Sequence, residues 1–281
     1  MKGKKDKKGK IIMESNLEPI NIFDFDGTLT TETWPKFWVW VKKFGYSGEK
    51  RNDDLENAIA KYRETHSGDM LETFFWFFND LLVKNNETIT YEDLLEGERY
   101  IKYHPGVIDF LEKSLVKNYI VSGGFKEFLE NLEIANNFEK IYGSDLKHNQ
   151  SGLISGVGEI MTDEKKILAI KDILKINNRL ENDCREVYYI GDGFSDAVAM
   201  SFVHNNGGKS ILVYQSDKKD KFNLQNRDIY EKLNEAGIVD YYCIADYRKG
   251  SKLFGFLQRN KAENKNWWPI QPKNWLKRIW K

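Results

Sequence analysis

Short apolar segments alternate with longer amphipathic ones over most of this chain, and the two patterns predict different elements. Apolar runs bounded by polar or glycine-rich turns predict strands that end at residue 24 and span 119–122, 187–190, 211–213 and 241–244, with further short strands within 141–160. Apolar residues at helical spacing predict helices at 105–117, 126–132, 163–176 and 227–236. Because such alternation is typical of a parallel sheet with helices on both faces, we expect a three-layer α/β sandwich.

The first strand runs directly into two carboxylates, Asp24 and Asp26, and Gly27 and Thr28 then break it. Residues two apart in a strand point to the same side, so both carboxylates start toward one place. Like charges held this close repel each other unless a cation or a proton lies between them. The pattern therefore predicts a metal site, a shared proton or both, while the simpler interpretation is an acidic turn without chemistry.

Three further polar motifs occupy strand ends or a helix start. They are Ser122-Gly123-Gly124 after the strand 119–122, Lys165-Lys166 at the start of the helix 163–176, and Asp192 and Asp196 in the turn after the strand 187–190. A hydroxyl and exposed amides can bind phosphate oxygens, a lysine can neutralise an anionic substrate, and two carboxylates suit Mg²⁺ and its supporting contacts. Alone, Ser-Gly-Gly is a common turn and two lysines on a helix are usually solvated, whereas the Asp192/Asp196 turn is more specific. Since the carboxyl ends of parallel strands lie at one edge of a sheet, we expect the four motifs to meet there.

Residues 33–100 interrupt the alternation and are rich in aromatic and helix-forming residues. We interpret them as a helical module inserted between the first strand and the rest of the sheet. The aromatic run 74–78 is then the core of that module rather than a ligand site, because aromatic side chains bury a large area per residue. A module at this position can still close over the acidic turn and exclude water from it.

Charge and cysteine content exclude several classes of function. The 281 residues contain 43 basic and 43 acidic side chains, so no nucleic acid or other polyanionic partner is expected. Cys184 and Cys243 lack the spacing of a metal site or of a disulfide framework. No apolar run reaches the roughly 18 residues that span a bilayer, and residues 11–13 are too short for a secretory signal. A cytoplasmic protein is therefore expected.

Both ends of the chain are basic. Residues 1–19 are expected to form a flexible arm, because the first ten residues carry six basic groups and one acid. The tail 248–281 combines basic residues with four tryptophans, a composition that also occurs in peripheral membrane anchors. We favour the alternative that the indole rings pack on the protein, because Pro269 and Pro272 interrupt any long amphipathic helix.

The four motifs, in this order, make the chain similar to the haloacid dehalogenase (HAD) superfamily of hydrolases over about residues 20–247. The resemblance implies a Rossmann-like core that consists of residues 20–32 and 101–247. It also implies that residues 33–100 form an inserted helical cap domain.

The same resemblance implies a role for each acidic residue. Asp24 is the expected nucleophile, which attacks phosphorus and forms an aspartyl-phosphate, and Asp26 is the expected general acid and base. The expected ligands of Mg²⁺ are Asp24, the backbone carbonyl of Asp26, and Asp192. Asp196 is expected to support this metal site from outside it.

Phosphate binding is assigned by the resemblance to Ser122, the Gly123 amide and one lysine. Of the two adjacent lysines we choose Lys166, because the family lysine is followed by apolar residues four and seven positions later. In this chain those positions are Ile170 and Ile173.

Together these residues predict a Mg²⁺-dependent phosphatase that hydrolyses a small phosphorylated metabolite. The carboxylate of Asp26 favours phosphoryl chemistry, because similar enzymes that act on carbon–halogen bonds lack an acid at this position. The position of the cap and the Ser-Gly-Gly motif resemble the phosphoserine phosphatase branch, although Thr33 stands where that branch has a substrate-binding glutamate. The alternatives are a phosphotransferase or phosphomutase that uses the same aspartyl-phosphate, and a phosphate-binding protein without turnover.

Overall fold

The computed structural model describes residues 4–5, 11–12, 17–31, 90–215 and 220–258, together with positions 57, 60–62, 64, 73 and 75–80. Most of the basic arm, much of the insert and the tail beyond residue 258 lie outside the described residues, so the predictions made for them stay predictions. Within the arm, β1 (Lys4–Lys5) and β2 (Ile11–Ile12) form a short antiparallel pair.

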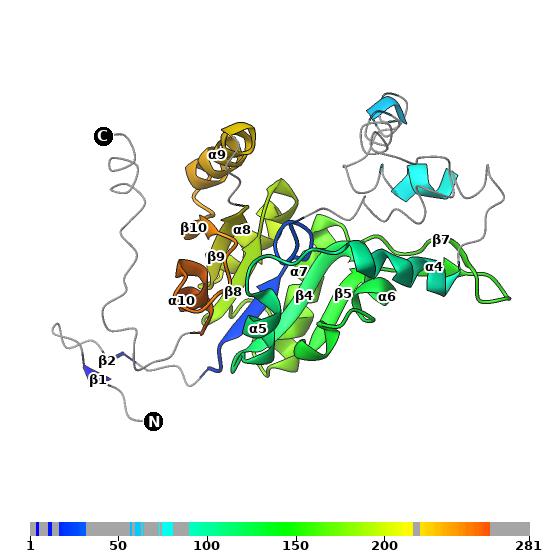
Figure 1. The fold of residues 1–281 in the computed structure, drawn as a ribbon. Coiled ribbons are helices and arrows are strands. Elements are labelled where there is room, and N and C mark those ends of the chain that lie inside the picture. Colours follow the sequence, from blue (N-terminus) through cyan, green and yellow to red (C-terminus); the bar gives the residue numbers. More distant parts are fainter. Residues whose placement is uncertain are drawn as a thin grey trace.

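A six-stranded sheet lies at the centre of the fold (Figure 1), and each neighbouring pair of its strands is parallel. Its strands are β3 (Ile20–Phe23), β4 (Lys117–Phe125), β5 (Lys140–Ser144), β8 (Val187–Gly191), β9 (Lys209–Tyr214) and β10 (Tyr241–Ile244). The spatial order is β10-β9-β8-β3-β4-β5. The strand β3, which leads to Asp24, therefore lies between β4, which carries Ser122, and β8, which leads to Asp192. The predicted α/β sandwich with a parallel sheet is confirmed.

Helices cover both faces of this sheet. The helices whose two ends are both described are α4 (Tyr91–Leu95), which lies in the insert, and α5 (Val107–Glu112), α6 (Lys126–Leu129), α7 (Asp163–Ile176), α8 (Ala197–Asn205), α9 (Asp220–Glu235) and α10 (Lys252–Gln258). The 3-10 turns are η2 (Glu96–Tyr100), η3 (Ala135–Asn137) and η4 (Phe194–Asp196). Successive strand residues point to opposite faces. Accordingly, Phe23 belongs to a buried cluster with residues of α5 and α10, whereas Ile22 belongs to a second cluster with residues of α7 and α8. Among the described residues, no helix has both the length and the hydrophobicity needed to cross a bilayer.

The prediction that Gly123 and Gly124 stop the second motif strand is wrong, because β4 continues to Phe125. The pairing of β4 with β5 becomes irregular between Val121 and Phe125, so the glycines interrupt the ladder without ending the strand. The Ser144 hydroxyl donates to the Gly123 carbonyl at 2.8 Å and replaces part of the missing backbone pairing.

Several predicted boundaries also move. The helix predicted at 105–117 is limited to α5, which ends at Glu112, because the chain must turn before β4 begins at Lys117. In that turn the Ser114 hydroxyl donates to the Val116 carbonyl. The helix predicted to reach residue 132 ends at Leu129. The short strands predicted within 141–160 are the end of β5 and a hairpin formed by β6 (Leu146–His148) and β7 (Ile154–Val157).

The described positions of the insert include helical residues that contact the core. Phe77 packs against Tyr62 inside the insert, with ring centroids 5.6 Å apart, as expected for the aromatic run 74–78. Phe75 and Phe78 instead pack against Phe125 at the end of β4, at 5.1 and 6.2 Å. Phe75, Phe77 and Phe78 are all buried, and two of them also join the insert to the sheet.

We expect Gly143→Ala to lower the free energy of unfolding by about 1–3 kcal/mol, because the added methyl has no room. A Cβ at Gly143 would lie 2.6 Å from the Gly124 carbonyl oxygen and 2.8 Å from the Lys126 amide. Gly255→Ala is the matched control: it lies within α10 with no atom within 4 Å of its Cβ, and should raise stability by about 0.5–1 kcal/mol. Urea unfolding of both variants measures the two effects, and equal stabilities would contradict the predicted close packing of β5 against β4.

Candidate active site

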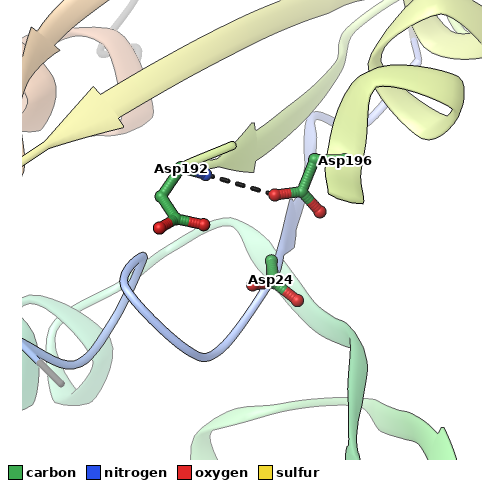
Figure 2. Close-up of side chains that lie close together, drawn as sticks. All are labelled: Asp24, Asp192 and Asp196. Carbon is green, nitrogen blue, oxygen red and sulfur yellow. Dashed lines mark hydrogen bonds between the residues drawn. The ribbon is translucent and has the colours of Figure 1, made fainter. Parts of the chain in front are cut away.

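The first and last of the sequence motifs meet at the carboxyl edge of the sheet, where Figure 2 shows Asp24, Asp192 and Asp196 close together. Asp24 follows the last residue of β3 and Asp192 follows the last residue of β8, and these two strands are neighbours. The Asp24 amide donates to the Ile190 carbonyl at 2.9 Å, which extends the strand pairing into the site. Carboxylate oxygens of Asp24, Asp192 and Asp196 lie within 4.8 Å of one another and form what we call the acidic triad.

Asp196 is completely buried, and donors bind both of its oxygens. Its Oδ1 accepts hydrogen bonds from Lys166 Nζ and from the Tyr189 hydroxyl, both at 2.8 Å, and its Oδ2 accepts one from the Asp192 amide at 3.2 Å. This approach requires glycine at position 191, where a Cβ would lie 2.4 Å from Asp196 Oδ2. Because its oxygens are already bound to donors, Asp196 is suited to orient Lys166 and the Asp192 backbone rather than to contact a ligand directly.

Lys166, and not its neighbour Lys165, lies in the site. The side chain of Lys166 is 4% exposed, and its Nζ is 3.7 Å from Asp24 Oδ1. Burial alone lowers the pKa of Lys166, but the nearby Asp196 and Asp24 carboxylates outweigh burial and raise the pKa, so the ammonium form is retained. Lys165 instead pairs with Glu159 at 2.8 Å, with its side chain 33% exposed.

The other two carboxyl groups of the triad, those of Asp24 and Asp192, both have raised pKa values. Burial and the charge of Asp196 raise the pKa of Asp24 to about 7, while Lys166 and a hydrogen bond from the Ser122 hydroxyl act in the opposite direction. Burial also raises the pKa of Asp192, together with the charges of Asp196 and Asp24. A divalent cation beside these carboxylates would remove the repulsion. Closely spaced carboxylate oxygens are ligands that Mg²⁺ prefers, so Asp24 and Asp192 fit such an ion, with Asp196 behind them.

Asp26 and the glycine-rich part of β4 lie beside each other. A Cβ on Gly124 would lie 3.6 Å from Ser122 Oγ and 3.8 Å from Asp26 Oδ2. Ser122 Oγ accepts a hydrogen bond from the Gly124 amide at 3.1 Å. On the other side of Asp26, Gly27 has a left-handed φ of 72°, and a Cβ there would lie 2.1 Å from Asp192 Oδ2. Glycine is therefore required where the turn after Asp26 passes Asp192.

In the structure, all candidate site residues predicted from the sequence lie at the carboxyl edge of the sheet. These residues are Asp24, Asp26, Ser122, Gly123, Lys166, Asp192 and Asp196. Tyr189 was missed, because a tyrosine within an apolar strand reads as a core residue. Its only sequence signal is a hydroxyl-bearing side chain three positions before Asp192 in the strand that leads to the site.

Comparison with known proteins agrees with this geometry. The model of the HAD family, described as haloacid dehalogenase-like hydrolase, matches residues 22–201. An uncharacterized protein of Borreliella burgdorferi is 26% identical over 172 residues, which cover 52% of this chain and 57% of that protein. The chain thus spans little more than half the length of that curated relative.

Solved structures with a similar fold include phosphoserine phosphatases. The apo form of one gives a TM-score of 0.53 at 14% identity, covering 82% of this chain and 94% of that chain. A substrate-bound phosphoserine phosphatase complex gives 0.54 at 16% identity, covering 83% and 95%. A HAD family hydrolase of Salmonella enterica serovar Typhi gives 0.58 at 16% identity, covering 87% and 73%. At these identities the likeness is one of fold.

The family match extends over more than half of the chain and includes all of the nominated site residues. Its fold, a six-stranded parallel sheet with helices on both faces, is the one shared with those structures. The chain belongs to the haloacid dehalogenase-like hydrolase family.

Proposed function

We propose that this protein is a Mg²⁺-dependent phosphatase that hydrolyses a small organic phosphomonoester through an aspartyl-phosphate on Asp24. The observation that carries the proposal is the position of the Lys166 ammonium, 3.7 Å from Asp24 and 2.8 Å from Asp196, beside three clustered carboxylates. A cation next to an aspartate nucleophile suits attack on an anionic substrate. A phospho-aspartyl intermediate analogue of phosphoserine phosphatase is among the structures of similar fold, which supports the same chemistry here.

Asp24, the backbone carbonyl of Asp26, and Asp192 would hold the Mg²⁺ ion. When bound, this ion supplies positive charge that stabilises the transferring phosphoryl group and offsets the repulsion within the acidic triad. Asp196 keeps Lys166 and the Asp192 backbone in place through its hydrogen bonds.

In the first step, a carboxylate oxygen of Asp24 attacks the phosphorus of the substrate. A bond forms between phosphorus and Asp24, and the bond between phosphorus and the ester oxygen breaks. Asp26 gives its proton to the departing oxygen, so the product leaves as an alcohol. Lys166, the Ser122 hydroxyl and the Gly123 amide bind the phosphoryl oxygens during this transfer.

In the second step, Asp26 is a carboxylate and accepts a proton from a water molecule whose oxygen attacks the phosphorus. The bond between phosphorus and Asp24 breaks, which restores the free carboxylate and releases inorganic phosphate. The two steps return Asp24 and Asp26 to their starting protonation states.

We further propose that the inserted cap, residues 33–100, selects the substrate. Phe75 and Phe78 pack against Phe125, three residues after Ser122, so this described part of the insert contacts the core close to the proposed phosphate site. Thr33, which replaces the glutamate of the phosphoserine phosphatase branch, lies outside the described residues. The substrate class therefore stays at small phosphorylated metabolites. Since Cys184 and Cys243 are both free and buried, a reducing compartment, the cytoplasm, remains the expected location.

Asp24→Asn should reduce hydrolysis of an aryl phosphate in the presence of Mg²⁺ by at least about a thousandfold, because the amide is no nucleophile. Release of alcohol and of phosphate should be measured in parallel, with Asp109→Asn, an exposed acid on α5, as the control that keeps full activity. Equal release of both products supports hydrolysis, whereas alcohol without phosphate indicates transfer to another acceptor. Activity that survives Asp24→Asn would exclude this residue as the nucleophile.

Lys166→Met should lower kcat by about a hundredfold or more, since it removes the cation beside the transferring group. Lys165→Met removes an equal charge one residue away but only from a partly exposed pair with Glu159, and should leave kcat within about twofold. Melting temperatures recorded for both variants separate loss of folding from loss of chemistry. The opposite ranking of the two lysines in kcat would contradict the assignment.

Without divalent cations, stability should fall as the pH rises from about 4 to 7. The pKa of Asp24 is raised by burial from 3.8 to about 7, so above pH 3.8 the unfolded chain releases a proton that the folded protein keeps. The favourable contribution is therefore complete below pH 3.8 and is gone once the pH has risen through about 7. The loss amounts to about 4 kcal/mol by linkage. Urea unfolding in EDTA should therefore show Asp24→Asn less pH-dependent than the wild type, and equal slopes would refute the raised pKa.

A further inference from the structure

The turn that follows Asp26 presents two consecutive backbone carbonyls to side chains from distant parts of the chain. His104 Nε2 lies 3.0 Å from the Gly27 carbonyl oxygen, and because that oxygen can only accept, Nε2 carries the proton. The Tyr247 hydroxyl donates to the Thr28 carbonyl at 2.8 Å, across 219 positions of sequence. Both donors are buried, with 3% and 0% exposure. We call these two hydrogen bonds the carbonyl clasp.

The two donors of the carbonyl clasp are themselves held in place. The His104 amide donates to the Leu29 carbonyl at 2.9 Å, and a β-bridge joins Thr30 to Tyr103 beside it. The Tyr247 amide donates to the Pro105 carbonyl at 2.8 Å, so the two donor segments are also tied to each other.

The ring of Tyr247 is fixed as well. It packs against Phe23, the residue before Asp24, at 6.3 Å between ring centroids, and against Phe110 of α5 at 5.6 Å. The hydroxyl is thus aimed at the Thr28 carbonyl by an aromatic contact with the same strand that carries the proposed nucleophile.

The turn held by the carbonyl clasp packs directly against Asp192 of the acidic triad. The Gly27 Cα sits so close to Asp192 that a Cβ would lie 2.1 Å from its carboxylate, and the peptide bond between Asp26 and Gly27 bears the carbonyl proposed to bind Mg²⁺. A rotation of the neighbouring peptides would therefore change both the direction of the Asp26 carbonyl and its distance from Asp192.

We propose that His104 and Tyr247 are positioning residues for the reaction, which hold the Asp26–Thr28 turn in the geometry that metal binding and phosphoryl transfer need. The inference rests on the proposed function for its catalytic part. The competing explanation is purely structural: buried carbonyls need partners, and the two side chains provide them. The two explanations differ in what a hydroxyl deletion does to catalysis at unchanged stability.

Tyr247→Phe tests this directly, because it removes only the hydroxyl, and Tyr119→Phe is its matched control. Tyr119 is equally buried, and its hydroxyl accepts a hydrogen bond from Asn177 at the far end of α7 from Lys166. We expect the two variants to lose similar amounts of melting temperature. Only Tyr247→Phe should lower kcat for an aryl phosphate, by about two- to tenfold as for one net hydrogen bond, and it should also reduce the rise in melting temperature that Mg²⁺ produces.

His104 is tested by a pair of substitutions. His104→Leu removes the donor and should lower kcat, whereas His104→Gln keeps an N–H near the position of Nε2 and should restore most of it. The loss of kcat in the double variant His104→Leu with Tyr247→Phe should be smaller than the product of the two single losses, because both substitutions act on one turn. Equal kcat values for His104→Leu and His104→Gln, or a Tyr247→Phe that behaves like Tyr119→Phe, would overturn the proposal.

Different results would refute the proposed function and the carbonyl clasp. A wild-type protein that hydrolyses no phosphomonoester refutes the proposed function. The carbonyl clasp is then still decided by the Mg²⁺-induced change in melting temperature, which requires no turnover: the same change in wild type, Tyr247→Phe and Tyr119→Phe refutes the clasp alone.

Discussion

Three carboxylates within 4.8 Å of one another at a largely buried sheet edge repel each other strongly, and the surrounding contacts are arranged around that repulsion. Lys166, Tyr189 and the Asp192 amide all donate to Asp196, which makes one of the three charges tolerable. The unfavourable charge that remains is concentrated on Asp24 and Asp192, whose pKa values are raised. That is where a divalent cation and the substrate's phosphoryl group are proposed to bind.

Close packing of the backbone is the second condition for this arrangement. Asp24 and Asp192 are brought together because β3 and β8 pair in parallel and end within one residue of each other. Glycines then allow the approach: a Cβ at Gly27 would collide with Asp192, and a Cβ at Gly191 would collide with Asp196. The site therefore depends on small residues as much as on charged ones.

Segments remote in sequence complete the site from both sides. The chain after β10 returns across the sheet edge, so Tyr247 binds the Thr28 carbonyl beside the contact made by His104. On the other side, Phe75 and Phe78 join the insert to the end of β4. The insert and the C-terminal segment thus both contact strands or turns of the candidate site.

By itself, the sequence determined the fold class, most elements and which candidate residues would meet, because local periodicity reports burial and the motif residues keep a distinctive order. Asp24, Ser122, Lys166 and Asp192 were all placed correctly at one sheet edge on this basis. Tertiary structure decided what depends on contacts between distant segments: that β4 runs through its glycines beside Gly143, and that Tyr189 points to Asp196. Periodicity records whether a position is buried but not which neighbour it meets, since strand order and register decide that only once the sheet has formed.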